Sequence, residues 1–318
     1  MTPPPAIAWR PEVISLCAIA ALYVASVLFV HFRGKVRHAL PRQLTDHSTF
    51  LAPYNALVYL FSAVPTRPIL EPDLLSEVAP LKAGWREIRE EALRLHEGGH
   101  IRGADRRDDL AFNTFFKRGW TRFYVKWYGE ILPSAAQACP RTAALVAAIP
   151  SVNAALFAYM PPHSRLGRHR DPFAGSLRYH LALVTPKAEG CRLYVDGIPY
   201  VWREGEAVLF DETYIHGARN DTDEGRIILF CDVARPLKTS VARAVNRFVT
   251  RHLMPHTAAR NVDSERIGVL NRVSAPVFRA REALERFKKR HRRVHYGAKY
   301  AAIVCVAYVV LRVALLAR

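Results

Sequence analysis

The sequence predicts an all-β core of the antiparallel barrel or jelly-roll type, flanked by α-helices, with a transmembrane helix at each end. Two observations predict the core. Many short β-rich runs follow residue 151 with no helical pattern between them, an arrangement typical of barrels and jelly rolls. Asp196-Gly197, between two of these runs, is a strong hairpin signal. The runs are VNAALFAYM, RYHLALVT, CRLYV, IPYVW, EAVLF and RIILFCDV.

The first apolar segment covers residues 13–32 and follows a short N-terminus, residues 1–12. It reads VISLCAIAALYVASVLFVHF, which is uncharged and long enough as a helix to cross the hydrocarbon core of a bilayer. A cleaved signal peptide is the alternative, but it would need a basic region before the apolar run. Here the basic residues, RGKVRH, come afterwards, so we expect a transmembrane helix.

The second apolar segment covers residues 300–317 and is interrupted by Arg312. A long arginine near a helix end can extend to the membrane interface, so the interruption is compatible with a second span. A helix lying in the interface is the alternative. We favour the span because residues 300–311 are apolar on every side rather than amphipathic.

Basic residues indicate how the two spans are oriented. Arg33, Lys35 and Arg37 follow the first span, and KKRHRR at 288–293 precedes the second. Because basic flanks favour the cytoplasmic side, we expect residues 33–299 in the cytoplasm and both termini in the periplasm.

Four regions are expected between the spans. Residues 33–72, rich in proline towards their end, predict a juxtamembrane connection. Residues 73–150 form a helical and aromatic support region, residues 151–236 the β-rich core, and residues 237–299 a basic helical region next to the membrane. Within the support region, NTFFKRGWTRFYVKWYG at 113–129 is either a strand with one aromatic and one solvated face or a surface for an amphiphilic, negatively charged ligand.

Charge distribution argues against a nucleic-acid-binding core. The formal net charge of the chain is +18, but residues 150–236 carry −1 and residues 237–299 carry +12. The basic excess therefore lies beside the β-rich core, which is not the pattern of a nucleic-acid reader. The five cysteines form no CxxC pair, which argues against a zinc site and a disulfide framework.

A potential metal site is divided between two parts of the core. His169 and Asp171 lie two apart, so in an extended segment both point to one face. This pair alone is weak evidence, since roughly half an HxD is expected by chance in a chain with this composition. His216, in the turn-rich stretch LFDETYIHGARND, adds a second imidazole. Two histidines and one carboxylate on one face form the facial triad of non-haem Fe(II) oxygenases.

Such a triad leaves three coordination positions open, which a bidentate cosubstrate can fill. 2-Oxoglutarate chelates through its keto oxygen and adjacent carboxylate and leaves its far carboxylate for an arginine. Arg226 and Arg178 are the candidates, and His180 shares the strand face of Arg178. Both residues could instead have structural roles. His180 could be a buried, hydrogen-bonded histidine, and Arg178 could pair with a nearby aspartate. Asp211 and Glu212 are expected to be turn residues rather than ligands.

These segments resemble the aspartyl/asparaginyl β-hydroxylase superfamily of Fe(II)/2-oxoglutarate dioxygenases, and within it the membrane-bound LpxO-type lipid A hydroxylases. The resemblance rests on RLGRHRDPFAGSLRYHLALV, LFDETYIHGARN and RIILFCDV, and it extends to HFRGKVRHALPRQLTDHSTF, the aromatic segment and the terminal apolar run. It implies a double-stranded β-helix, with His169, Asp171 and His216 as iron ligands. Arg178, His180 and Arg226 would surround 2-oxoglutarate, and O2 would be the second cosubstrate.

The expected activity is hydroxylation of lipid A at C2 of a secondary acyl chain, on the cytoplasmic face of a bacterial inner membrane. Lipid A or another anionic glycolipid is the expected partner, together with the membrane and without nucleic acid. One alternative is a protein aspartyl/asparaginyl β-hydroxylase; such enzymes have glycine where this chain has Asp171, which argues against that activity. The other alternative is a non-catalytic, cupin-like membrane protein that binds a ligand.

Overall fold

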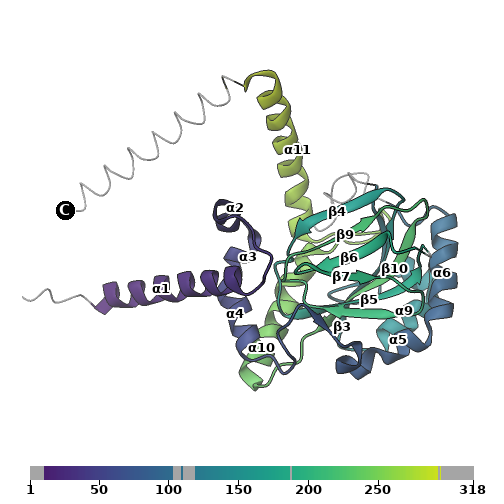
Figure 1. Ribbon diagram of the computed structural model, residues 1–318, viewed down its shortest axis with the longest axis horizontal. Coiled ribbons are helices and arrows are strands. Elements are labelled where there is room, and N and C mark those ends of the chain that lie inside the picture. The colour runs from purple at the N-terminus through teal and green to yellow at the C-terminus, as the bar shows by residue number, and fades with distance from the viewer. Residues whose placement is uncertain (1–10, 103–108, 110–118, 187, 293, 295–318) are drawn as a thin grey trace, which may run out of the picture.

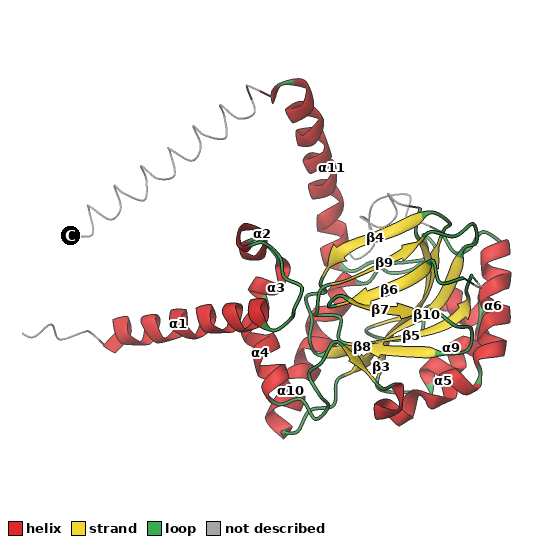
Figure 2. Cartoon of the chain, viewed as in Figure 1, coloured by secondary structure: helices red, strands yellow, loops and turns green. Residues whose placement is uncertain are grey.

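The computed structural model of the chain describes residues 11–102, 109, 119–186, 188–292 and 294. Two antiparallel sheets face each other in its centre, as Figure 1 and Figure 2 show. The larger sheet has the order β1-β8-β5-β10-β3-β2 and the smaller sheet the order β4-β9-β6-β7. The strands are β1 (Ile69–Leu70), β2 (Thr121–Trp127), β3 (Val152–Met160), β4 (Ser164–His169), β5 (Ser176–Val184), β6 (Cys191–Val195), β7 (Ile198–Val201), β8 (Ala207–Phe210), β9 (His216–Asn220) and β10 (Arg226–Ala234).

From β3 to β10 the chain passes back and forth between the two sheets, which is the strand arrangement of a jelly roll. The prediction of an antiparallel β core is therefore confirmed. The hairpin expected at Asp196-Gly197 is present, since Val195 pairs with Ile198. Both turn residues have positive φ, 52° at Asp196 and 85° at Gly197, as a tight two-residue hairpin turn requires.

One group of helices covers the outer face of the larger sheet, and the helices of the N-terminal segment lie at another side of the core (Figure 2). The α-helices are α1 (Pro11–Phe32), α2 (Leu40–Leu44), α3 (His47–Phe50), α4 (Ala52–Leu60), α5 (Ala79–Ala83), α6 (Trp85–Glu97), α8 (Pro133–Ala138), α9 (Pro140–Ala147), α10 (Ser240–Phe248) and α11 (Val269–Arg290). Shorter helical turns are η1 (Pro72–Val78), η2 (Val249–Leu253) and η3 (Met254–Thr257).

The central strands are buried on both faces, and the alternation of their side chains separates two cores. On β5, Tyr179 and Leu181 pack towards α5 and α6. Ala182 packs into the space between the sheets, on the same face as Arg178 and His180. The two polar residues therefore point into the jelly roll because strand periodicity places them there.

Helix α1 extends away from the jelly roll (Figure 1). Its segment Ile14–Phe32 has a mean hydropathy of 2.2 and is long and apolar enough to cross a membrane. Most of its large side chains are exposed, for example Leu16 and Leu22. An apolar surface of this kind is unfavourable in water and favours a lipid environment. The second predicted span, residues 300–317, lies outside the described residues.

The aromatic segment at 113–129 is described only from residue 119 onward. Within it, β2 pairs with β3, as expected of a strand. The expected solvated face is wrong for this strand, because Arg122 and Val125 as well as Tyr124 are buried. Arg122 is buried together with Asp109, to which its Nε donates a 2.8 Å hydrogen bond. A buried ion pair thus replaces solvent on that face.

Candidate metal centre and anion pocket

The two histidines of the predicted site face each other because of a β-bulge between β4 and β9. Two residues of β4, Gly167 and Arg168, together oppose the single residue Gly217 of β9. The extra residue brings His169 directly opposite His216, where a regular ladder would place Arg168. The two imidazole rings consequently lie with their centroids 4.3 Å apart.

Asp171 follows β4 and completes a group of three potential metal ligands. Its backbone N–H donates a 2.9 Å hydrogen bond to the carbonyl oxygen of Glu212, which holds it beside the loop that leads to β9. One ligand atom from each of His169, Asp171 and His216 lies within 4.8 Å of the other two. The structure therefore brings together the three residues that the sequence predicts as ligands.

Backbone contacts set the chemical state of both imidazoles. Nδ1 of His169 lies 2.9 Å from the carbonyl oxygen of Gly167, and Nδ1 of His216 lies 3.0 Å from that of Tyr214. A carbonyl only accepts, so each Nδ1 carries the proton and each Nε2 carries the lone pair that a metal needs. Burial, reinforced by the neighbouring His169, lowers the pKa of His216 to about 3, so this ring is neutral at physiological pH.

Arg178 projects from β5 into the space between the sheets and connects three carboxylates. Its Nε donates a 2.7 Å hydrogen bond to Oδ1 of Asp232, and its Nη2 donates a 2.8 Å hydrogen bond to Oδ2 of Asp171. Nη2 also forms an ion pair with Glu212. Arg178 thus fixes the orientation of the Asp171 carboxylate. The alternative expected from the sequence, that Arg178 pairs with a nearby aspartate, is confirmed by these contacts.

The three carboxylates around Arg178 differ in their protonation. Burial by itself would raise the pKa of Asp171, but the neighbouring charge of Arg178 is the main cause that lowers it to about 2. Burial dominates at Glu212 and raises its pKa well above the ordinary value, and burial also raises the pKa of Asp232. Asp171 is therefore the member that stays ionised and can bind a cation.

A second polar group lies deeper between the sheets, around Arg226 at the start of β10. Arg226 is 1% exposed, and its Nε and Nη1 have no hydrogen-bond partner. The ring nitrogens of His180 and Nε1 of Trp202 are also buried without a partner. The guanidinium carbon of Arg226 lies 4.4 Å from the centroid of the Trp202 ring, which stacks on His180 at 5.6 Å.

Buried donors without partners are rare in folded proteins and call for an explanation. Burial lowers the pKa of Arg226, and burial also lowers that of His180 to well below its ordinary value, so the surroundings disfavour both charges. A carboxylate placed against Arg226 would supply the missing acceptor and the missing negative charge. We call the group formed by Arg226, His180 and Trp202 the anion pocket.

The anion pocket adjoins the metal centre through one aromatic ring. The ring of Phe210 contacts His180 at 5.0 Å and His216 at 5.5 Å, both in edge-on geometry. A small molecule that ligates a metal at His216 could therefore reach Arg226 with its other end. The donor set of the metal centre suits Fe(II), and the anion pocket suits the far carboxylate of 2-oxoglutarate.

The chain that leaves α1 holds the loop in front of His216. The guanidinium of Arg33 is buried between the rings of Tyr59 and Tyr214, 3.8 and 3.9 Å from their centroids. It donates a 2.8 Å hydrogen bond to Oγ1 of Thr213 and forms an ion pair with the fully buried Asp211. Asp211 lies in a turn as expected, but its role there is a buried ion pair.

The same N-terminal region also holds the loop that carries His169 and Asp171. Nη1 of Arg170 donates a 3.0 Å hydrogen bond to the carbonyl oxygen of Val30, in the last turns of α1. His47 of α3 contacts the carbonyl oxygen of Arg170 at 2.7 Å, and Arg42 of α2 donates to that of Arg168 at 3.2 Å. Both ligand-bearing loops are thus fixed by the segment next to the apolar helix.

Several residues of the site were not identified from the sequence. Glu212 was expected to be an ordinary turn residue, and Asp232, Trp202 and Arg33 were not singled out. Asp232 carried one usable signal, since a charged residue within the apolar run RIILFCDV is unusual for a buried strand. Arg33 had no such signal, because a basic residue after a membrane helix is expected there anyway.

Comparison with known proteins shows what the core is similar to. Residues 82–236 match the family model described as aspartyl/asparaginyl beta-hydroxylase. The ornithine lipid ester-linked acyl 2-hydroxylase of Rhizobium tropici is 40% identical over 128 residues, which cover 40% of this chain and 45% of that protein. The aspartyl/asparaginyl beta-hydroxylase of Homo sapiens is 28% identical over 171 residues, which cover 52% of this chain and 22% of that protein.

The chain thus spans less than half the length of these curated relatives. Among solved structures, a Pseudomonas putida prolyl-4-hydroxylase matches with a TM-score of 0.34 and 18% identity, over 51% of this chain and 98% of that one. The jelly roll and the matched segment coincide over β2 to β10. Residues 82–236 of this protein are therefore similar to the aspartyl/asparaginyl beta-hydroxylase family.

Proposed function

We propose that the protein is an Fe(II)- and 2-oxoglutarate-dependent dioxygenase that hydroxylates C2 of a secondary acyl chain of lipid A, at the cytoplasmic face of a bacterial inner membrane. The observation that carries the proposal is the position of the ligand group His169, Asp171 and His216 near Arg226, a buried arginine with two guanidinium nitrogens that have no acceptor. When bound, iron and 2-oxoglutarate would supply the oxidant, formed with O2, for an unactivated C–H bond.

The residues of this chain would bind and orient these groups. His169, Asp171 and His216 would hold the metal, with Arg178 fixing the carboxylate of Asp171. Arg226 would bind the far carboxylate of 2-oxoglutarate through its guanidinium fork. His180, neutral and stacked on Trp202, would shape the same pocket.

A membrane lipid is the substrate class that other features support. The apolar helix ends at the segment that fixes both ligand-bearing loops, so the metal centre would lie close to the bilayer surface. The short helices α2 and α3 and the end of α4 expose large apolar side chains, namely Leu40, Leu44, Phe50 and Leu60. The similar protein from Rhizobium tropici is an acyl 2-hydroxylase of a lipid, which supports the same reaction here.

Mass spectrometry of lipids from cells with and without the protein tests the proposal. We expect lipid A to gain one oxygen on an acyl chain in cells that express the wild type, and not in cells that express His169→Ala or Asp171→Ala. Immunoblotting of membranes would control for amounts of protein. Oxygen gained by ornithine lipid in place of lipid A would correct the substrate, and unchanged lipids with a hydroxylated aspartyl or asparaginyl side chain would refute acyl hydroxylation.

A further inference from the structure

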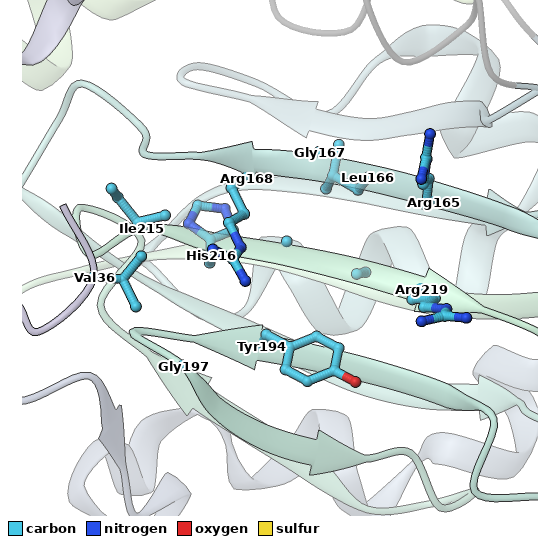
Figure 3. Close-up of a pocket in the computed structure, with 12 residues that line it drawn as sticks. Val36, Arg165, Leu166, Gly167, Arg168, Tyr194, Gly197, Ile215, His216 and Arg219 are labelled. Atoms are coloured by element: carbon cyan, nitrogen blue, oxygen red, sulfur yellow. The ribbon is translucent and has the colours of Figure 1, made fainter. Parts of the chain in front are cut away.

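An open groove runs along the outer face of the smaller sheet, over β4, β9 and β6 (Figure 3). Its volume is about 650 Å³. The side chains of Arg165, Arg168 and Arg219 line it, together with Tyr194, and none of its lining residues is acidic. The function proposed above does not use this groove.

Three arginines form a row across three adjacent strands at the groove. Arg219 of β9 lies directly opposite Arg165 of β4 on one side and opposite Arg192 of β6 on the other. Residues directly opposite each other in antiparallel strands project to the same face, and like charges in such positions repel. Carboxylates flank the row, since Asp221 pairs with Arg219 and Glu189 pairs with Arg192.

The groove begins at the metal centre. His216 and Gly167, which precedes His169 by two residues, belong to its lining. Val36 and Gly197 lie at the same end, where the chain arrives from the apolar helix. Arg219 follows His216 by three residues on one strand, which corresponds to about 10 Å along the strand and places the two side chains on opposite faces of the sheet. A headgroup whose reacting chain enters the metal centre past the edge strand β4 would therefore lie close to the arginine row.

The proposed reaction makes such a headgroup site necessary. C2 of an acyl chain is bonded to the ester carbonyl carbon, so the point at which the chain is attached to the rest of the lipid lies only two bonds from the carbon that reacts. The substrate must also bind in one register, because adjacent methylenes of an acyl chain are chemically alike. A polar anchor at a fixed distance from the metal would select C2.

We propose that this groove binds a phosphate group on the headgroup of the lipid substrate, an inference that rests on the acyl hydroxylase function proposed above. Guanidinium forks match phosphate oxygens in pairs, and the absence of carboxylates from the lining of this groove favours a dianion. The bound phosphate would relieve the repulsion within the row of Arg165, Arg219 and Arg192. A phosphorylated glycolipid fits the groove, whereas a lipid without phosphate would lose these contacts.

The test compares two double variants that remove the same charge. Arg165→Gln with Arg219→Gln alters the groove. Arg86→Gln with Arg94→Gln is the matched control, on the exposed side of α6, which packs against the other sheet. Arg94 pairs with Glu91 much as Arg219 pairs with Asp221, so each variant removes an arginine that forms an ion pair. Thermal unfolding checks that each variant folds, and Arg165→Gln alone is assayed if the groove double variant does not.

Hydroxylation is measured with full-length protein on a phosphorylated glycolipid and on the same lipid after phosphatase treatment. We expect the groove variant to raise KM for the phosphorylated lipid by about tenfold or more with little change in kcat, because charge-assisted hydrogen bonds are lost. KM for the dephosphorylated lipid should stay the same, and the control should behave like wild type. An equal effect in both variants, or no effect in the groove variant, would overturn the proposal.

Binding separates this inference from the proposed function. Wild type and both variants are added to phosphatidylcholine vesicles that contain either form of the lipid, a measurement that requires no turnover. Even if no acyl hydroxylation is found, a preference for the phosphorylated vesicles that only the groove variant loses would support the groove. No preference in the wild type would refute it. Equally tight binding of inorganic phosphate would assign the groove to the free ion and refute the headgroup assignment.

Discussion

At the scale of single residues, the site contains two buried arginines with opposite surroundings. Arg178 is in contact with three carboxylates, whereas Arg226 has two guanidinium nitrogens without a hydrogen-bond partner. A buried charge without a partner costs several kcal/mol, so Arg226 destabilises the folded chain unless an anion joins it. This contrast distinguishes an arginine that orients Asp171 from one for which we propose a role in binding the cosubstrate.

The variant Arg226→Met tests that distinction. We expect it to unfold at a temperature equal to or higher than that of the wild type without cosubstrate, because an apolar side chain of similar length replaces an unpaired charge. Addition of 2-oxoglutarate with Fe(II) should stabilise the wild type by about 3 kcal/mol at 100 times Kd, and the variant far less. Differential scanning calorimetry with and without 2-oxoglutarate measures both effects.

Arg226→Lys provides the control, since it keeps the charge and removes the fork. It should retain part of the stabilisation by 2-oxoglutarate. If Arg226→Met were stabilised by 2-oxoglutarate as strongly as the wild type, the anion pocket would not be the site of the far carboxylate.

At the scale of elements, the bulge between β4 and β9 decides which side chains reach the metal centre. It depends on Gly217, because a Cβ atom at this position would lie 2.9 Å from the carbonyl oxygen of Leu166. Real Cβ atoms are not found so close to a backbone oxygen, so the two strands would have to separate. Their separation would pull His169 away from His216.

Gly217→Ala should therefore weaken metal binding and destabilise the fold by about 1–3 kcal/mol. The reason is steric, since the new methyl group meets backbone rather than a flexible side chain. Titration with Co(II), followed by its absorption spectrum, and urea unfolding measure the two effects. Gly129→Ala is the matched control, because its Cβ would meet no atom closer than 3.7 Å. Equal metal affinity in both variants would contradict the importance of the bulge.

At the scale of the whole molecule, the apolar helix and the metal centre form one connected unit. Arg33, directly after α1, and Arg235, directly after β10, both form ion pairs with Asp211. Burial alone would raise the pKa of Asp211, but these two arginines lower it from 3.8 to about 2. A carboxyl group whose pKa is lower in the folded state stabilises the fold above its unfolded pKa and loses this effect as the pH falls towards its folded pKa.

The variant Asp211→Asn should consequently be less stable than the wild type by about 3 kcal/mol at neutral pH, since it leaves two buried guanidinium groups without their carboxylate. The difference in free energy of unfolding between the two proteins should shrink by about 2 kcal/mol as the pH falls from about 5 towards 2. Urea unfolding in detergent over this pH range measures it. A difference that stays constant with pH would show that the ion pairs do not stabilise the fold.

Much of the architecture could be predicted from local patterns. The apolar run at 13–32, the strand-forming runs after 151 and the hairpin at Asp196-Gly197 are each defined by neighbouring residues. The candidate site was predicted in part: His169 and His216 were identified, but not the bulge that makes them face each other. No pattern within β4 shows that its ladder with β9 will slip by one residue.

Local sequence patterns predict an apolar helix, an antiparallel core, and the histidines, carboxylate and arginines of the candidate metal and anion site. These features depend on periodicity and on side-chain type, which are properties of short segments. The folded chain is needed to see that Arg178 orients Asp171 and that two nitrogens of Arg226 lack an acceptor. It is also needed to see that Arg33 contacts Asp211, 178 residues further along the chain. Such pairings depend on the register of distant strands and on burial, which arise only when the whole chain has folded.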